Sequence, residues 1–393
     1  MTLGIFMLLI CISEYWCKIG AKIIYLYVKS FSDYIIDVKA IRHNILQVKK
    51  VTKDTKICAV VKADGYGVGT KYFVKYIDDL VFCYAVACFK EAVELRKNTF
   101  KDILILNTIP KENLCFCAEN NFEVSVFSKS QILQMIKVLS KKSGKKLKLH
   151  LAVNTGMNRI GFDGEQEFFD TVRLIIMHND LFEIKGIFTH IYNALCKKDA
   201  ELQIKIFKKY VNILKQFGIK DPIIHSSATT AGVDYTDFRF DMIRLGIGMY
   251  GFFDGKTNLK LKQTIALESK IIKLTQIKKG DSVGYGKNFV AKHNMRIATI
   301  PLGYADGIFR CYAKNGFVII NNHLCKIVGN ICMDMFMCDV TKANASLNDR
   351  VIVIGSSKNH KINCVYVAKK CDTICYEILT NIKKNRLNIK ILS

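Results

Sequence analysis

Short apolar runs alternate with segments of helical periodicity between about residue 33 and residue 262. Apolar residues recur at i, i+3 and i+4 in Ser130–Leu139 and in Ile204–Phe217, which predicts amphipathic helices. Repeated strand and helix units predict a parallel sheet covered by helices, and seven or eight of them fit an α/β fold of the (β/α)8 TIM-type barrel kind. The runs expected to be strands are Ile57–Val61, Leu80–Val86, Ile103–Leu106, Phe122–Val126, Lys146–Val153, Ile184–Thr189 and Ile223–His225.

A second pattern begins at about Thr264, where one strand-like run follows another. Turn residues punctuate it at 279–281, 315–316 and 321–322. This change predicts a mostly β carboxy-terminal domain. We therefore divide the chain into an extension at 1–32, to which the pattern assigns no role, a barrel at 33–262 and a β-rich domain at 263–393.

The extension contains an apolar stretch, Leu3–Ile12, with the length of a signal-peptide core. It is too short for a membrane span, which needs about 20 residues. No basic residue precedes it, because the first lysine is Lys18, and no small-residue cleavage site follows. A true extension, a signal and a mis-assigned start all stay open. No other long uncharged apolar run occurs, so we expect no membrane association.

Composition narrows the class of protein. Half of the 393 residues are apolar and only 3 are proline, which excludes a disordered or low-complexity chain. The net charge is +25, but the basic residues are scattered in pairs, so we expect solvated lysines rather than a nucleic-acid partner. The 15 cysteines contain no C-x-x-C pair, which favours reduced thiols in a cytoplasmic protein.

Candidate chemistry begins at Lys62, which directly follows an apolar run. Such barrels build their active sites at the carboxyl ends of the strands. A glycine-rich stretch, Ala63–Gly69, comes next, and glycines let backbone N–H groups approach a phosphate. A lysine beside a phosphate site suits a Schiff base with a phosphorylated aldehyde cofactor. Taken alone, the same lysine also fits an ordinary surface position.

Seven motifs resemble those of the alanine racemases, in the order in which that family has them. The segment Ala59–Gly69 is similar to the family's pyridoxal-phosphate attachment signature. Together the seven cover about residues 33 to 386, and a set in order is far more specific than one motif. The other six are Asn154–Gly161, His225 with Met242–Gly251, Val283–Gly286, Gly303–Gly307, Gly329–Asp334 and Tyr376–Leu379.

The resemblance implies a fold-type III enzyme that uses pyridoxal 5′-phosphate, with a barrel followed by a β domain. It implies that an early strand, here Tyr34–Asp37, joins the second domain. It also implies a homodimer with active sites shared between subunits. The implied reaction is the interconversion of L-alanine and D-alanine, which supplies D-alanine for peptidoglycan synthesis.

The resemblance further implies a role for each matching residue. Lys62 would carry the cofactor and act as the base on one face of the substrate, and Tyr285 of the partner subunit would act on the other. His190 would hydrogen-bond that tyrosine, and Arg244, held by His225, would donate to the pyridine nitrogen. The other implied contacts are the phosphate ligands Tyr66, Thr229, Gly246, Ile247 and Tyr376, the carboxylate ligands Arg159 and Met333, and Tyr304, which narrows the entrance together with Tyr376.

An arginine beside the pyridine nitrogen changes the chemistry of the cofactor. A guanidinium is permanently cationic, so Arg244 would leave the pyridine nitrogen unprotonated and weaken the cofactor as an electron sink. We expect this to favour racemisation over transamination.

Three positions depart from the family pattern. Ala152 stands where many members have a carbamylated lysine, Asn154 where they have aspartate, and Ala228 where they have asparagine. The first two changes remove negative charge near Arg159, so we expect chloride or water to hold its guanidinium and the activity to be modest.

Other functions remain open. A racemase of serine or another small amino acid shares every motif, because a pocket discriminates weakly against one hydroxyl. A homologue that binds the cofactor with weakened activity would also fit the departures. A decarboxylase of the same fold type would want an acidic partner for the pyridine nitrogen, and Arg244 argues against it. A single-domain cofactor-binding protein would lack the β-rich domain.

Overall fold

The computed structural model describes residues 30–141 and 144–393, which form two compact units. The barrel unit comprises Ile35–Ala266, Lys361–Ile382 and Ile391–Ser393. The β-rich unit comprises Leu267–His360 and Lys383–Lys390, together with the described residues 30–34. The signal-like stretch lies outside the described residues.

Eight parallel strands form the sheet of the barrel unit, in the order β8-β7-β6-β5-β4-β3-β2-β9. Two backbone hydrogen bonds, from Asp241 to Ile224 (3.0 Å) and from Arg244 to Ser227 (2.9 Å), join the β9 segment to the β8 segment and close the barrel. The predicted TIM-type barrel is therefore confirmed. The strands are β2 (Lys56–Val60), β3 (Cys83–Val86), β4 (Ile103–Ile105), β5 (Phe122–Val126), β6 (Leu147–Ala152), β7 (Phe182–Phe188), β8 (Ile223–His225) and β9 (Met242–Leu245).

The apolar runs located seven of these eight strands, β2 to β8, whereas β9 was not among the expected strands. The run Leu80–Val86 was expected to be one strand, but β3 begins only at Cys83 because Asp78–Leu80 forms a short 3-10 helix. The barrel strands are buried along most of their length, as parallel strands covered on both faces must be.

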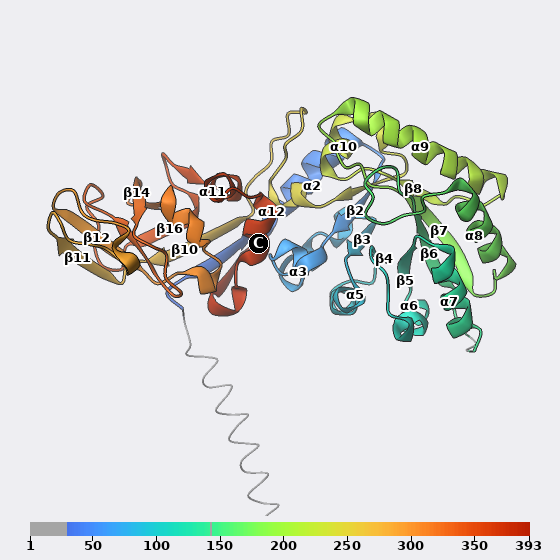
Figure 1. The fold of residues 1–393 in the computed structure, drawn as a ribbon, viewed down its shortest axis with the longest axis horizontal. Helices are drawn as coiled ribbons and strands as arrows, with labels where there is room; N and C mark the ends of the chain where they lie inside the picture. The colour runs from blue at the N-terminus through green and yellow to red at the C-terminus, as the bar shows by residue number, and fades with distance from the viewer. Residues whose placement is uncertain (1–29, 142–143) are drawn as a thin grey trace, which may run out of the picture. The chain divides into compact units, whose positions relative to one another are not determined.

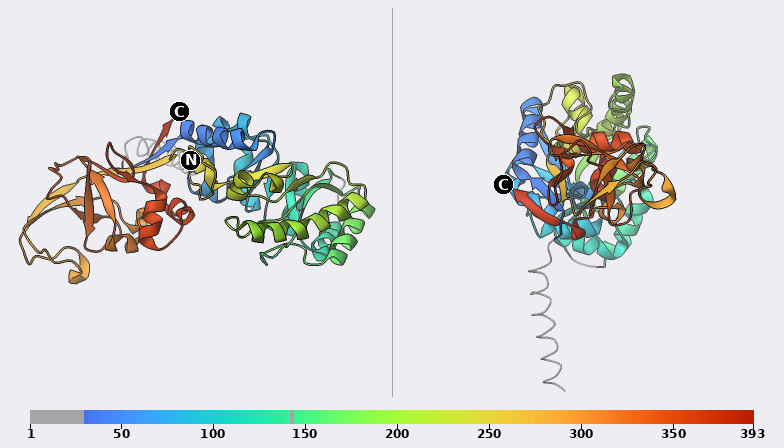
Figure 2. Two further views of the ribbon diagram at one scale, coloured as in Figure 1. Left: turned by 90° about the horizontal axis from the view of Figure 1, so that it is seen from above. Right: turned by 90° about the vertical axis from the view of Figure 1, so that its left-hand side faces the viewer.

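Helices surround the barrel strands on the outside (Figure 1; Figure 2). In α9 the buried residues Ile204, Phe207, Val211 and Leu214 recur at three- and four-residue spacing, which explains why this segment lies on the sheet. The helices are α2 (Val38–Thr52), α3 (Lys62–Tyr66), α4 (Thr70–Phe73), α5 (Phe89–Arg96), α6 (Leu114–Glu119), α7 (Lys129–Leu139), α8 (Glu165–Met177), α9 (Lys197–Gln216), α10 (Thr229–Asp234), α11 (Cys364–Cys371) and α12 (Cys375–Asn381).

A second sheet has ten strands, and most of them come from the carboxy-terminal region. This confirms the predicted mostly β region. Nine of the strands follow the order β11-β12-β15-β14-β13-β16-β10-β1-β18. The predicted turn at Asn321 and Asn322 joins β13 to β14, and both residues have positive φ, as a tight hairpin requires. The strands are β1 (Asp33–Asp37), β10 (Ile265–Lys270), β11 (Lys273–Ile277), β12 (Met295–Ile300), β13 (Phe317–Ile320), β14 (His323–Val328), β15 (Phe336–Asp339), β16 (Arg350–Ser356), β17 (Lys361–Ile362) and β18 (Asn388–Leu392).

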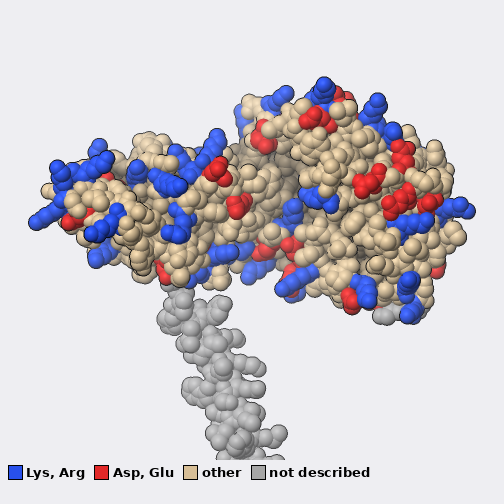
Figure 3. All heavy atoms as spheres, in the orientation of Figure 1, with Lys and Arg blue, Asp and Glu red and all other residues tan. Residues whose placement is uncertain are grey.

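The surface carries the excess of basic residues in a dispersed form. Figure 3 shows Lys and Arg side chains spread over the visible face, with Asp and Glu between them. Among the helices of the described chain, none combines the length and the apolar character that crossing a membrane requires.

Candidate active site

A cavity of about 410 Å³ collects many of the residues that the sequence predicts to be functional. It opens at the carboxyl ends of the barrel strands, where such folds place their active sites. The predicted residues that line it are Lys62 and Tyr66 from the turn after β2, Arg159 after β6, His190 after β7, Arg244 on β9, Gly246 and Ile247 after β9, and Tyr376 on α12.

The turn after Lys62 has an unusual backbone. Four consecutive residues, Ala63–Tyr66, have φ between 51° and 67°, the left-handed region. This conformation costs roughly 1–2 kcal/mol for each residue that carries a Cβ, and only Gly65 in the run escapes that cost. Strained backbone of this kind persists where surrounding contacts fix it, and it is concentrated at functional sites.

Two carboxylates fix this turn. Glu91 on α5 accepts from the backbone N–H of Ala63 and of Ala87, both at 2.8 Å. Asp64 accepts from the N–H (2.8 Å) and the hydroxyl (2.9 Å) of Thr70. The turn that carries the lysine is thus tied to α5 through Glu91 and to α4 through Thr70.

Lys62 has a reactive environment. Burial lowers the pKa of its amine below the ordinary value, and the positive charges of Arg159 and Arg244 lower it further, while Glu91 opposes them. The amine makes no hydrogen bond or ion pair with any described residue. Lys62 therefore presents an amine that loses its proton more easily than an exposed lysine.

Hydroxyl groups gather on one side of the cavity. Tyr66 packs between the rings of Tyr250 (5.4 Å between centroids) and Tyr376 (5.8 Å). Burial raises the pKa of Tyr66 above its ordinary value, and burial, Cys375 and Asp254 raise that of Tyr376 to about 12. Both phenols stay protonated at neutral pH and can donate hydrogen bonds.

Gly246 makes room for these hydroxyls. A Cβ at this position would lie 2.3 Å from the Tyr66 hydroxyl oxygen, so only glycine permits the approach. Thr229 lies behind the same segment rather than on the cavity wall, and its hydroxyl accepts from the N–H of Gly246 (3.4 Å) and of Gly248 (3.5 Å). Thr229 thus supports the segment that borders the cavity.

Arg244 is only 4% exposed, and its terminal nitrogens are used by the protein. Nη1 donates to Nδ1 of His225 at 2.7 Å. Nη2 donates to the carbonyl oxygens of Thr189 (2.7 Å) and Ser226 (2.8 Å) and lies 3.2 Å from Nδ1 of His190. Nε has no hydrogen-bond partner among the described residues, and Arg244 lines the cavity. The fifth N–H of the guanidinium is therefore free to bind a ligand.

The charge on Arg244 survives its burial. Burial, together with the neighbouring charge of Arg159, lowers the pKa of the guanidinium to about 10. This value still lies well above neutral pH, so the side chain remains a cation. The ring of Phe188 supports it, with the guanidinium carbon 5.5 Å from the ring centroid.

His190 is a neutral donor in this environment. Burial and the charges of Arg244, Arg159 and Lys62 lower its pKa to about 3. Its Nδ1 faces an Arg244 N–H and must accept, so its single proton is on Nε2. Nε2 has no described partner, which leaves this N–H available.

Arg159 differs from Arg244 because no described residue holds its guanidinium. The nearby position Ala152 is buried. A small cavity of about 20 Å³ borders Ala152, Arg159 and His190, and it accommodates one water-sized molecule. The expectation that chloride or water holds Arg159 stays a prediction.

Asn154 organises the turn that leads to Arg159. Its Nδ2 donates to Asp163 (2.5 Å) and to the side chain of Asn158 (2.9 Å). Its Oδ1 accepts from the N–H of Gly156 (3.1 Å) and of Asn158 (3.0 Å). The amide thus bonds with both its donor and its acceptor, and an aspartate could not replace the donor.

Three predicted residues, Tyr285, Tyr304 and Met333, belong to the β-rich unit. Tyr285 is 73% exposed, and its hydroxyl has no described partner. Tyr304 and Met333 are also exposed, and the N–H of Ala305 donates to the carbonyl of Met333 at 2.9 Å, which places them in adjoining turns.

Asp306 anchors these turns. It accepts from the N–H of Gly303 (2.8 Å) and from Nε of Arg386 (2.7 Å). Arg386 also donates to Asp334 at 2.7 Å. The turns that carry Tyr304 and Met333 are therefore joined by one arginine, which the sequence analysis did not single out.

Gln203 on α9 is a second residue that sequence analysis missed. It is buried, and its Nε2 donates to the hydroxyl of Thr155 (2.9 Å) and to the carbonyl of His190 (3.1 Å). Its Oε1 accepts from the N–H of Tyr192 at 3.0 Å. A lone amide among the apolar positions of an amphipathic helix was the available signal.

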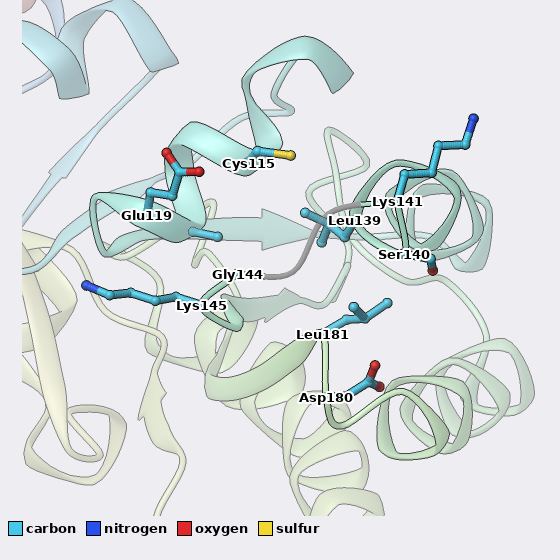
Figure 4. Close-up of a pocket in the computed structure, with 10 residues that line it drawn as sticks. Cys115, Glu119, Leu139, Ser140, Lys141, Gly144, Lys145, Asp180 and Leu181 are labelled. Atoms are coloured by element: carbon cyan, nitrogen blue, oxygen red, sulfur yellow. The ribbon is translucent and has the colours of Figure 1, made fainter.

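A different cavity of about 510 Å³ is shown in Figure 4. Its walls include Glu119, Lys145 and Asp180, in the segments that lead into β5, β6 and β7. It therefore lies at the amino ends of the strands, and none of the predicted functional residues lines it. Among the described residues, no group of three or more His, Cys, Asp or Glu side chains could hold a metal ion.

The site defines a class of protein: a (β/α)8 barrel enzyme whose cavity offers a lysine amine, a bound arginine and phenolic donors to an anionic cofactor. Family models confirm and narrow this class. Residues 36–253 match the alanine racemase N-terminal domain, and residues 264–390 match the alanine racemase C-terminal domain. The chain belongs to the alanine racemase family.

Individual proteins with similar sequences or structures are alanine racemases as well. The alanine racemase of Ligilactobacillus salivarius is 34% identical over 360 residues, which cover 88% of this chain and 95% of that protein. The alanine racemase of Bacillus anthracis with bound L-Ala-P has a TM-score of 0.87 at 28% identity, covering 93% of this chain and 96% of that one. The alanine racemase of Bartonella henselae with covalently bound pyridoxal phosphate has a TM-score of 0.82 at 28% identity, covering 92% of this chain and 99% of that one.

Proposed function

We propose that the barrel cavity is the catalytic site of a pyridoxal-phosphate-dependent racemase that interconverts L-alanine and D-alanine. The observation that carries this proposal is the arrangement around Arg244. Its terminal nitrogens bond with the protein, its Nε–H remains free, and the amine of Lys62 lines the same cavity. A guanidinium that keeps its proton at neutral pH is suited to a racemase rather than to a transaminase.

The residues present fit the cofactor. The phenols of Tyr66 and Tyr376 and the close-approaching backbone at Gly246 form a cradle for a phosphate, and a Cβ at residue 246 would fill it. Lys62 would hold the aldehyde carbon, and the Arg244 Nε–H would face the pyridine nitrogen. When bound, pyridoxal phosphate withdraws electrons from the α-carbon of an attached amino acid and so makes the α-proton acidic.

Two groups of the chain move that proton. Lys62 has a lowered pKa, so its amine can take a proton from one face of the substrate near neutral pH. The phenol of Tyr285 of the partner subunit would serve the opposite face. The neutral His190 offers its Nε2–H to that phenol, and this hydrogen bond favours the phenolate.

Substrate binding falls to the remaining predicted residues. Arg159 has a guanidinium free of protein partners, and Met333 has an N–H with no described acceptor, so both can bind a carboxylate. Tyr304 and Tyr376 would narrow the entrance and limit the substrate to a small amino acid. Alanine is the substrate that the family favours, and serine is the second candidate.

The active enzyme in this proposal is a homodimer in which each site takes Lys62 from one subunit and Tyr285 from the other. The exposure of Tyr285 supports it, because a catalytic phenol without a partner in its own chain needs one elsewhere. Buried cysteines such as Cys58, Cys117 and Cys338 carry free thiols, which supports a cytoplasmic enzyme.

A chiral assay tests the proposal. The purified protein, loaded with the cofactor, should convert L-alanine to an equal mixture of the two enantiomers, and L-serine more slowly. Absence of conversion with full cofactor occupancy would contradict the function.

Mixing experiments test the shared site. A K62A subunit and a Y285F subunit should each be inactive alone. After reassortment, activity should return to roughly a quarter of the wild-type value, because half of the dimers are mixed and each mixed dimer has one intact site. Subunit exchange without recovery would show that both residues act from one chain.

A further inference from the structure

Four polar side chains cross the interior of the barrel in one line. Arg244 Nη1 lies 2.7 Å from Nδ1 of His225, and Nε2 of His225 lies 3.0 Å from Nδ1 of His150. Nε2 of His150 lies 2.9 Å from Oε2 of Glu123 on β5. All four residues are buried. We call them the barrel relay.

The two ends of the relay determine where its protons are. Arg244 can only donate, and an ionised Glu123 can only accept. His225 must therefore accept through Nδ1 and donate through Nε2, and His150 must do the same toward Glu123. Between these ends, only this assignment of protons satisfies all three contacts. Both imidazoles are neutral and carry their proton on Nε2.

Packing fixes the two rings. Gly186 on β7 faces His150, and a Cβ there would lie 2.6 Å from Nδ1 and from Cε1 of the imidazole. The His225 ring stacks on Phe188 at 5.1 Å between centroids, with an angle of 17° between the planes. Neither ring is therefore free to turn and reverse its nitrogens.

We propose that Glu123 and His150 are positioning residues of the racemase, which hold Arg244 by fixing the tautomer of His225. This proposal deepens the function proposed above and rests on it for the cofactor end of the relay. The carboxylate makes His150 a donor at Nε2 and an acceptor at Nδ1, which makes His225 an acceptor toward Arg244. The guanidinium is then held with its Nε–H free for the pyridine nitrogen.

An extra proton breaks the relay. If His150 becomes an imidazolium, its Nδ1–H faces the Nε2–H of His225. The conflict is relieved only if His225 moves its proton to Nδ1, where it faces the Arg244 N–H. Either way, one donor meets another and a buried contact is lost, which is costly.

The surroundings keep the relay in its working state. Burial alone would raise the pKa of Glu123, but the hydrogen bond from His150 and the charges of Lys148 and Lys185 lower it below its ordinary value. A hydrogen bond with Cys58 and burial raise the pKa of the Cys83 thiol, and the charge of Glu123 raises it further, so this thiol stays neutral.

The histidine next to Arg244 is kept neutral in a similar way. Burial and the charge of Arg244 lower the pKa of His225 well below its ordinary value. The charged end and the neutral middle of the relay are thus both favoured at neutral pH.

The test compares two substitutions of one residue. E123Q retains an oxygen that can accept from His150 but removes the charge, whereas E123L removes the acceptor. The matched control is E183Q, because Glu183 is an exposed carboxylate near the amino end of β7, two strands away from β5, and pairs with Lys185 at 3.3 Å without touching the relay. The probe is the holoenzyme labelled with ¹⁵N in its 8 histidines, followed by long-range ¹H–¹⁵N NMR.

The wild-type spectrum at neutral pH should contain two histidines with the proton on Nε2. E123Q and E183Q should leave both signals in that state. E123L should shift both together toward the Nδ1–H state and lower kcat by roughly tenfold with little change in KM for alanine. E123Q should retain activity within about threefold of wild type.

Three results would overturn the proposal: a wild-type histidine pair that is protonated or carries Nδ1–H, an E123L spectrum like that of wild type, or equal losses of kcat in E123Q and E123L. The wild-type spectrum decides the tautomers even if E123L fails to fold. A wild-type enzyme that does not racemise alanine but shows the predicted tautomers would contradict the proposed function and leave the relay standing.

Discussion

The two units of this protein hold their functional residues in opposite ways. In the barrel unit, Arg244 is buried and bonds with several protein groups, and Lys62 sits on a turn fixed by two carboxylates. In the β-rich unit, Tyr285, Tyr304 and Met333 lie exposed in turns. The barrel residues are positioned by the chain's own contacts, whereas the others present side chains with few contacts.

This difference separates stability from catalysis. In the proposed mechanism a residue such as Arg244 serves both, because removing it would also leave buried carbonyl oxygens without donors. A residue such as Tyr285 would serve only the reaction, because its hydroxyl satisfies nothing in the described chain. Substitutions in the two units should therefore divide into those that change folding and those that change only activity.

The largest expected effect is that of K62A in the barrel unit. Removing the amine that is proposed to hold the cofactor and to move the proton should lower kcat by about 10³-fold or more. Stability should not fall, because burial disfavours the charged amine and no described residue bonds with it. The control is K71A, a lysine nearby in α4, which should retain activity. Racemisation by K62A close to the wild-type rate would contradict the assignment.

The next effect concerns Y285F in the β-rich unit. Loss of a general acid or base should lower kcat by roughly 10²–10⁴-fold. Urea unfolding should not change, because the hydroxyl is exposed and unpartnered. A fall in stability together with activity would show that this phenol is bonded as tightly as the barrel residues, and the contrast between the units would fail.

Sequence reasoning found the fold and many residues of the cavity because each is marked locally. Apolar runs mark the strands, and Lys62 and Arg244 belong to short motifs. It did not find Glu123 or His150, because these residues come from separate strands and their meeting depends on the closure of the barrel. It also missed Gln203 and Arg386, whose partners lie 13 and 80 residues away in the sequence. Contacts between distant segments have no local pattern.

A smaller effect is expected on the free energy of unfolding of the barrel unit when the pH is lowered. The folded pKa of His190 is about 3, far below the ordinary value of 6.5, so below pH 6.5 the unfolded chain binds a proton that the folded chain does not. Stability from this group is fully present above pH 6.5 and falls as the pH decreases toward about 3. The free energy of unfolding should therefore fall on acidification by up to about 1.4 kcal/mol per pH unit for this histidine.

The H190Q variant isolates that contribution. Its free energy of unfolding, measured in urea by circular dichroism between pH 6.5 and 4.5, should depend less steeply on pH than that of wild type. An equal slope in the two proteins would mean that His190 takes up its proton in the folded state, and the neutral donor proposed for the partner's Tyr285 would be lost.

The smallest effect tests the departure from the family pattern beside Arg159. N154D restores the residue expected from the family, yet in this chain Nδ2 of Asn154 donates to Asp163 at 2.5 Å. Two carboxylates would then face each other, and the donor to Asn158 would be lost as well. Because the site is exposed, the repulsion is screened, and we expect KM for alanine to rise by only about threefold.

The double variant N154D/D163N should return KM to the wild-type value, because the amide and the carboxylate have exchanged places. A lower KM in N154D alone would show that negative charge near Arg159 improves substrate binding, and that the asparagine is not adapted to its neighbours.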